Sequence, residues 1–104
     1  MRLSAAQKML FEKGLSPRHK GFHYLSAALC AAARGESVDK ACRSVDAGRT
    51  HHADRCMRYA IRYAWDGSEG DIHETFRKYT IPPTPVELIH AILWRLDETE
   101  SGQK

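Results

Sequence analysis

The chain has 104 residues, which is enough for one domain with its own core and too short for a second. Its net charge is +3, and residues 49–63 carry all of it, because they hold four arginines and one acid. No segment approaches the roughly 18 consecutive apolar residues that a membrane span needs, and the three cysteines form neither a CxxC pair nor a disulfide framework. These features exclude a membrane-spanning or disulfide-stapled protein, and we expect a cytoplasmic protein with reduced thiols.

The first third of the chain has the apolar spacing of two helices. From residue 3 onward, apolar residues recur every three or four positions until Gly14, which ends the first helix. Ser16 and Pro17 then predict an N-cap and a first-turn proline for a long second helix that extends to Gly35. We expect this second helix to be central to the fold.

The segment 50–65 is predicted to be a helix with two different faces, capped by Thr50. At about 100° per residue, one narrow stripe contains His51, Arg55, Arg58 and Arg62. The opposite face is small or apolar and contains Ala53, Met57, Ala60, Ile61 and Ala64. One face can therefore pack on a core, while the other offers permanently charged guanidinium groups to an anionic partner such as nucleic acid.

A short helix is expected immediately before this basic helix. Ser37 can cap it, and its inner side would contain Val38, Ala41, Cys42 and Val45. A turn of about four residues that contains a glycine then leads into the basic helix, which is the pattern of a helix-turn-helix. The alternative is a solvated basic face that binds nothing.

Two further helices are expected in the C-terminal third. Ser68 and Asp71 can open a fifth helix, which would pack Ile72, Phe76 and Tyr79. After a rigid connector at residues 81–83, the sequence Thr-Pro-Val-Glu at 84–87 combines an N-cap, a first-turn proline and a carboxylate at the third position. The sixth helix therefore begins here, with a buried side of Leu88, Ile89, Ile92, Leu93 and Leu96.

Trp94 falls opposite that buried side, close to His90. A tryptophan in this position either folds over a neighbouring loop or, together with His90, anchors a subunit contact. We expect one helical domain over residues 1–97 and a polar tail over 98–104.

Three segments, taken in order, resemble a known family, the C-terminal DNA-binding effector domain of the sporulation initiation regulator, stage-zero sporulation protein A. GLSPRHKGFHYLSAAL at 14–29 is similar to its lysine-glycine-aromatic helix, and DRCMRYAIRYAW at 54–65 is similar to its recognition helix. PPTPVELIHAIL at 82–93 is similar to its proline-threonine lead into the last helix. The resemblance covers most of the chain and implies a bacterial, six-helix, all-α domain that contains a helix-turn-helix and regulates transcription on double-stranded DNA.

The resemblance also implies roles for residues of the basic helix. Asp54, Arg55 and Arg58 would contact base edges, since arginine can donate two hydrogen bonds to guanine and a carboxylate can accept one from cytosine. The flanking residues would contact the DNA backbone, and these are Arg49, Thr50, His51, Tyr59 and Arg62.

The chain departs from the family in ways that affect these expectations. Asp54 stands where the family usually has glutamate, and His52 where it usually has arginine. We expect the family's receiver domain to be absent and therefore expect a stand-alone effector-like domain.

A rival interpretation is a protein-interaction module that pairs with a related regulator without binding DNA, and a homodimer on DNA is a third arrangement. We expect no bound metal or cofactor, because His19 and His23 lack a third metal ligand nearby in sequence. We also expect no set of catalytic residues, and therefore no enzyme.

Overall fold

The computed structural model describes residues 1–45, 52–67 and 70–102, with side chains to residue 96. The described residues form six helices and no strand, as the sequence predicts for an all-α fold. In chain order the helices are α1 (Leu3–Glu12), α2 (Lys20–Ala33), α3 (Val38–Ser44), α4 (His52–Gly67), α5 (Ile72–Thr75) and α6 (Pro85–Gly102).

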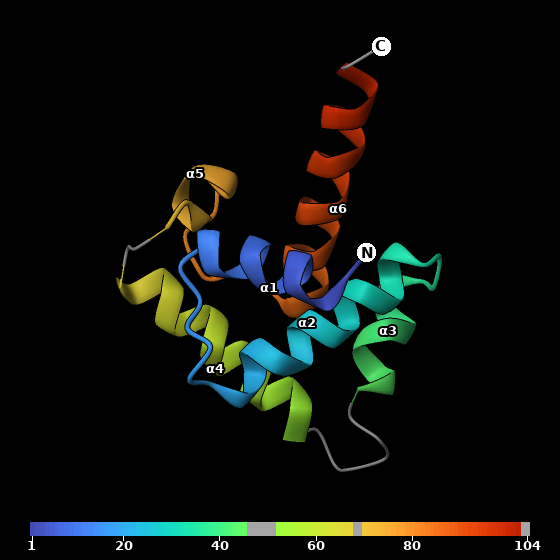
Figure 1. Cartoon of the computed structure of the whole chain (residues 1–104). Helices are drawn as coiled ribbons and strands as arrows, with labels where there is room; N and C mark the ends of the chain where they lie inside the picture. The colour runs from blue at the N-terminus through green and yellow to red at the C-terminus, as the bar shows by residue number, and fades with distance from the viewer. Residues whose placement is uncertain (46–51, 68–69, 103–104) are drawn as a thin grey trace.

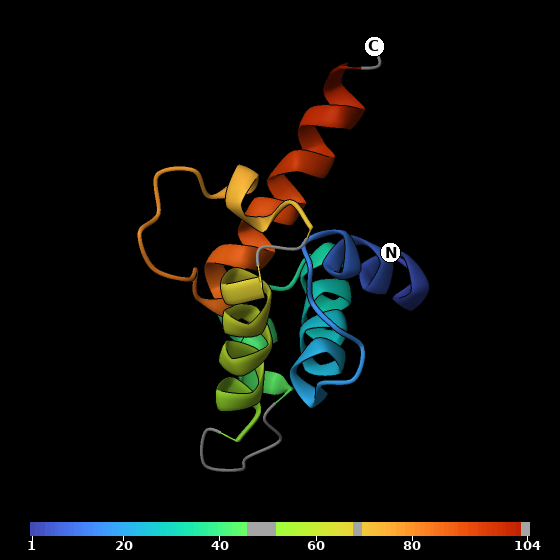
Figure 2. The ribbon, with the colours of Figure 1, turned by 90° about the vertical axis from the view of Figure 1, so that its left-hand side faces the viewer.

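The central helix is α2, which packs against α1, α3, α4 and α6 (Figure 1). Its sequence explains this position, because small and apolar residues occupy most of its circumference. Most of these side chains are buried, as expected for a helix surrounded by others. The C-terminal part of α6 projects away from the other helices, as the second view also shows (Figure 2). The protein thus consists of a core around α2 from which one helix protrudes.

Several predicted helix boundaries are confirmed by the hydrogen bonds at the helix ends. The Ser37 hydroxyl oxygen accepts from the Lys40 amide at 3.2 Å and caps α3. At the start of α6, the Thr84 hydroxyl oxygen accepts from the Glu87 amide at 3.2 Å, while the Glu87 carboxylate accepts from the Thr84 amide at 2.9 Å. This reciprocal pair is a capping box, and it fixes the first turn of α6.

The predicted start of α2 at Ser16 is wrong. The Ser16 hydroxyl oxygen accepts from the Arg18 amide at 3.3 Å, and its carbonyl oxygen accepts from the His19 amide at 3.2 Å. Ser16 therefore caps a separate turn, and α2 begins at Lys20 with His19 in the N-cap position.

The end of α4 and the beginning of α5 also differ from the prediction. Asp66 and Gly67 continue α4 instead of ending it, and Asp66 lies one turn beyond Arg62, 3.8 Å from its guanidinium group. Asp71 precedes α5, but its side chain does not cap that helix, because its carboxylate pairs with Lys13 at 2.8 Å. The suggested cap Ser68 lies outside the described residues.

Hydrophobic packing in the C-terminal third follows the prediction only in part. Ile72, Phe76, Leu88, Ile89 and Ile92 are buried, whereas Leu93 and Leu96 are half-buried. Tyr79 is exposed because its hydroxyl group reaches out to donate to the Glu87 carboxylate at 2.6 Å. The backbone of residues 98–102, expected to be a polar tail, continues α6.

The end of α1 is clamped to the segment that follows α4. The Asp71 amide donates to the Glu12 carbonyl oxygen at 2.9 Å, beside the Lys13–Asp71 ion pair. Gly70, which has a φ of +73°, lies so close to the backbone of residues 12–14 that a Cβ atom there would overlap it. This contact anchors the residues directly before α5 to the end of α1.

Candidate nucleic-acid interface

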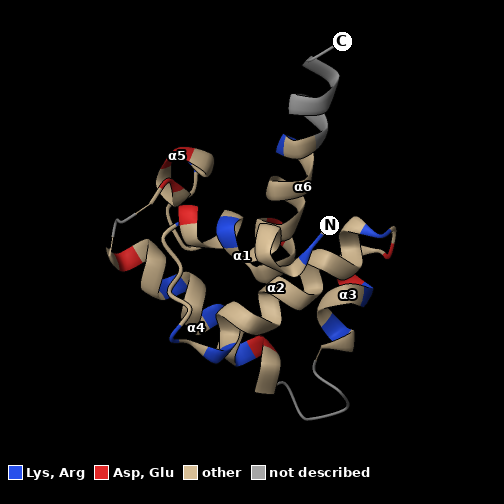
Figure 3. Ribbon diagram, in the orientation of Figure 1, with Lys and Arg blue, Asp and Glu red and all other residues tan. Residues whose placement is uncertain are grey.

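The two faces predicted for α4 are present in the structure. The small and apolar residues Ala53, Met57, Ala60, Ile61 and Ala64 are buried. Arg55, Arg58 and Arg62 are exposed on the outer side of the helix. Figure 3 shows basic residues along α4 and at the start of α2. The outer face of α4 is therefore open to a partner and predominantly basic.

Three of the residues predicted to contact the DNA backbone cannot be placed. Arg49, Thr50 and His51 lie outside the described residues, and so does the turn expected between α3 and α4. Within the described part of the chain, α3 packs mainly on α2 and α6. The helix-turn-helix thus stays a prediction, whereas Tyr59 and Arg62 are located and exposed.

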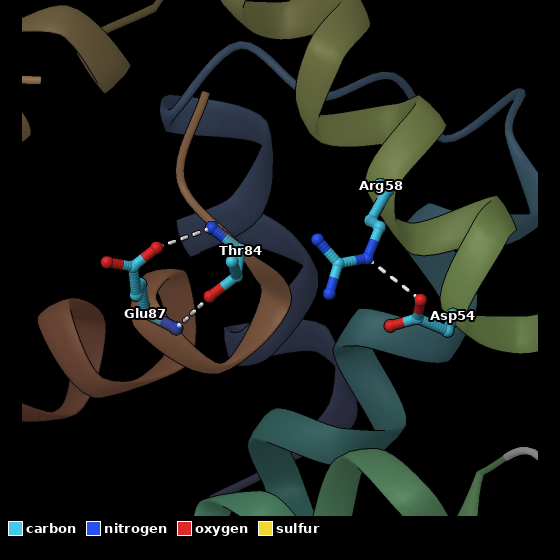
Figure 4. Close-up of polar contacts among 4 residues, drawn as sticks. All are labelled: Asp54, Arg58, Thr84 and Glu87. Carbon is cyan, nitrogen blue, oxygen red and sulfur yellow. Dashed lines mark hydrogen bonds and ion pairs between the residues drawn. The ribbon is translucent and has the colours of Figure 1, made fainter. Parts of the chain in front are cut away.

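Two of the three arginines on α4 have an acidic neighbour one turn away. The Arg58 Nε atom lies 2.8 Å from the Asp54 carboxylate (Figure 4), and the Arg62 Nε atom lies 3.8 Å from that of Asp66. All four side chains are more than 40% exposed, and exposed pairs of this kind contribute about 0.2–1 kcal/mol. Both pairs can therefore open when a stronger anionic ligand or a base edge approaches.

Arg58 also lies close to the first turn of α6. In Figure 4 its terminal guanidinium nitrogens point from α4 toward Thr84. The pKa of Glu87 is lowered chiefly by the hydrogen bond from Tyr79, then by the Thr84 amide, and also by the positive charge of Arg58. The start of α6 thus forms one border of the exposed α4 surface.

A groove between α4 and the start of α2 forms the other border. We call it the basic groove, and its lining consists of Arg18, His19, Lys20, Gly21, His52, Arg55, Cys56 and Tyr59. No carboxylate lines it, and no described residue forms an ion pair or hydrogen bond with the side chain of Lys20 or Arg55. The groove therefore offers uncompensated positive charge beside the exposed basic face of α4.

Arg18 and Lys20 were not among the residues predicted for this site. They precede or begin α2, far from α4 in sequence, so the helical pattern of residues 50–65 cannot reveal them. The signal that could have found them is the run Arg-His-Lys at 18–20 directly before Gly21 near a helix start, since glycine permits a close helix crossing.

The crossing of α2 and α4 is held by Gly21 and by aromatic contacts. A Cβ atom on Gly21 would overlap the Cys56 carbonyl group, so only glycine fits here. The His19 ring meets the rings of Tyr59 and Tyr63 edge-on, with centroids 5.2 and 4.6 Å apart, and its buried Nδ1 has no hydrogen-bond partner among the described atoms. These contacts fix Lys20 relative to Arg55.

The cysteines differ in their surroundings. Cys30 is buried, while Cys42 and Cys56 are half-buried, so Cys42, expected on the inner side of α3, is only partly covered. Burial, followed by the charges of Asp39 and Asp54, raises the pKa of Cys42 to about 11. Among the described residues, no three His, Cys, Asp or Glu side chains come together in a way that could hold a metal ion.

Trp94 and His90 lie apart from the basic groove. Both are exposed on α6, and Trp94 is 66% accessible. Trp94 therefore does not fold over a loop, which leaves the predicted subunit contact as the alternative to be tested.

Comparisons with protein-family models, with curated proteins and with solved structures found no match to this chain. None of the described helices combines the length and the apolar character required to cross a membrane.

Proposed function

We propose that the protein binds specific sequences in double-stranded DNA and regulates transcription, with α4 as the recognition helix of a helix-turn-helix. The observation that carries this proposal is the exposure of Arg55, Arg58 and Arg62 on one face of a helix whose other face is buried. A helix of this kind fits a major groove about 12 Å wide. The resemblance to the sporulation-regulator effector domain supports the same function.

Base recognition is assigned to Asp54, Arg55 and Arg58. Arg55 has no ion-pair partner among the described residues and can donate to a guanine without first breaking a contact. Arg58 shares its Nε with Asp54, and its terminal nitrogens remain available for the two hydrogen bonds that guanine accepts. The carboxylate both orients Arg58 and can accept from a cytosine. Asp54 and Arg58 therefore act as one recognition unit.

Contacts with the DNA backbone are assigned to Arg49, Thr50, His51, Tyr59 and Arg62. Such contacts determine the register of the protein on the duplex without reading its sequence. If about six phosphates are contacted in total, affinity falls on the order of a thousandfold between 50 and 200 mM salt. A weak salt response would contradict a phosphate-binding surface.

The test is selection of duplexes from a random-sequence pool by the purified full chain, followed by measurement of affinity for the enriched and a scrambled duplex. Arg55→Ala and Arg58→Ala should each reduce the affinity ratio between the two duplexes by roughly 5- to 150-fold, because a base contact contributes about 1–3 kcal/mol of discrimination. Arg62→Ala should weaken binding to both duplexes equally. Identical behaviour of the three variants would refute the division of roles between base and backbone contacts. If the selection enriches no motif, sequence-specific binding is refuted.

The second candidate function is a protein-interaction module that modulates a related transcription regulator. The observation that favours it is the exposure of Trp94, and of His90 one helical turn before it, on the protruding helix α6. Exposed tryptophans are frequent anchors of protein interfaces. This function predicts no binding to duplex DNA at low salt and loss of a regulator complex or of self-association in Trp94→Ala.

A further inference from the structure

We infer that the basic groove binds one phosphate of the DNA backbone, with Lys20 as its principal ligand and Arg18 as a second. This inference rests on the proposed function and adds a contact from α2, outside the helix-turn-helix. It assigns the start of α2 to positioning the duplex relative to α4.

The charges of the groove favour a phosphate over other occupants. Arg18, Lys20 and Arg55 line it together, without a carboxylate. Lys20 is exposed and makes no ion pair or hydrogen bond through its side chain with any described residue. Arg18 donates from one terminal nitrogen to the Tyr63 hydroxyl group at 3.2 Å, which orients its guanidinium group and leaves further donors available.

The backbone of α2 adds to this preference. The helix has 14 residues, no acid in its first turn and no side-chain cap at His19. Its N-terminal end, which carries the partial positive charge of the helix dipole, borders the same groove through Lys20 and Gly21. The side-chain charges and the helix end thus favour the same anionic ligand.

The position of the groove identifies the phosphate as one that flanks the recognition helix. Arg55 borders the basic groove and also belongs to the outer face of α4. When α4 lies in a major groove, a sugar-phosphate ridge runs along each of its sides. The start of α2, which the Gly21 contact holds directly against α4, would meet one of these ridges. A phosphate bound there would fix the depth and register at which Arg55 approaches the bases.

The experiment combines Lys20→Gln with duplexes in which single phosphates are replaced by neutral methylphosphonates. The methylphosphonate probe is a duplex enriched from the random pool; if none is enriched, the salt slopes of wild type and Lys20→Gln on a random-sequence duplex are compared instead, because non-specific binding has no fixed register. Wild-type protein should lose roughly tenfold in affinity at one or two methylphosphonate positions, as expected for a hydrogen bond to a charged group. Lys20→Gln should lose nothing further at one of those positions, and its salt slope should be smaller by about 0.9.

The matched control is Lys8→Gln, which removes an exposed lysine from α1, a helix that does not line the basic groove. It should keep both the wild-type salt slope and the wild-type methylphosphonate pattern. Arg18→Gln should resemble Lys20→Gln with a smaller effect.

The outcomes separate this inference from the proposed function. If the wild-type protein binds no duplex, both fail. If it binds and Lys20→Gln behaves like Lys8→Gln, the groove is not a phosphate site, while the assignment of α4 stands. If Lys20→Gln and wild type respond alike at every methylphosphonate position, the inference is overturned as well.

Discussion

Replacing Gly21 by alanine tests the helix crossing on which the candidate site depends. The added Cβ atom would overlap the carbonyl carbon and oxygen of Cys56 and approach the amide nitrogen of Met57. All of these are backbone atoms, so no side-chain rotation can relieve the overlap and α2 must move away from α4. Overpacking of this kind costs about 1–3 kcal/mol, and the helix propensity gained on replacing glycine offsets at most about 1 kcal/mol of that.

The expected result for Gly21→Ala is a net destabilisation of about 1–2 kcal/mol, or a decrease in Tm of roughly 4–16 °C for a domain of this size. Thermal unfolding followed by circular dichroism measures it. Gly67→Ala is the matched control, because Gly67 is also helical and a Cβ atom there meets nothing within 4 Å. That variant should unfold at or above the wild-type temperature. Equal Tm values for the two variants would refute the close crossing of α2 and α4.

Three further predictions follow from particular contacts. Asp71→Ala should lower the free energy of unfolding by about 2 kcal/mol in urea denaturation, because it leaves the buried Lys13 ammonium group unpaired; an unchanged midpoint would refute the role of this pair. Because the folded pKa of Glu87 is lowered, its stabilising contribution is present above its ordinary pKa and is lost as the pH falls through the folded pKa. Glu87→Gln should therefore lose less stability than wild type between pH 5 and pH 3, and parallel acid-denaturation curves would contradict this. At pH 8 a maleimide should label Cys56 faster than Cys42, because the raised pKa of Cys42, about 11, keeps its thiol protonated. Bound duplex should slow the labelling of Cys56, and peptide mapping by mass spectrometry measures both rates. Equal labelling of Cys56 with and without duplex would place this residue outside the interface.

The helices themselves could be predicted because their signals are local. In α4, apolar residues recur every three or four positions, and this pattern depends only on the sequence of the helix itself. The buried and exposed faces of α4 agree with it. The capping box at Thr84 and Glu87 is likewise encoded within four residues. In α3 and α6 the predicted cap is formed directly before the apolar period, and there sequence and structure agree on where the helix begins.

The errors arise where a tertiary contact, or a local turn, uses the residue that the sequence pattern assigns to a helix cap. Asp71 has the position of a helix cap, but the buried ammonium group of Lys13, distant in sequence, takes its carboxylate instead. Ser16 uses its hydroxyl group within a local turn, so α2 begins at Lys20, three residues after the predicted first-turn proline Pro17. The Asp71 outcome cannot be deduced from periodicity, because it depends on which distant segment is adjacent in space. The Ser16 outcome cannot be deduced from periodicity either, because a serine followed by a proline can begin a turn as well as a helix.

The candidate site was predictable only in its central part. The stripe of Arg55, Arg58 and Arg62 follows from helical geometry. The position of Lys20 beside this stripe does not, since it requires knowledge that Gly21 brings α2 against α4. Sequence reasoning therefore predicts the exposed basic face of α4 and misses the basic groove beside it.

The most direct test of the account is an amide NMR titration of the isotope-labelled full chain with an enriched duplex. The account predicts that signals from residues 52–62 and 18–21 shift or broaden on DNA binding, while the side-chain indole signal of Trp94 is unchanged at equimolar duplex. Shifts confined to α6, with the α4 signals unaffected by duplex at low salt, would contradict DNA recognition by α4.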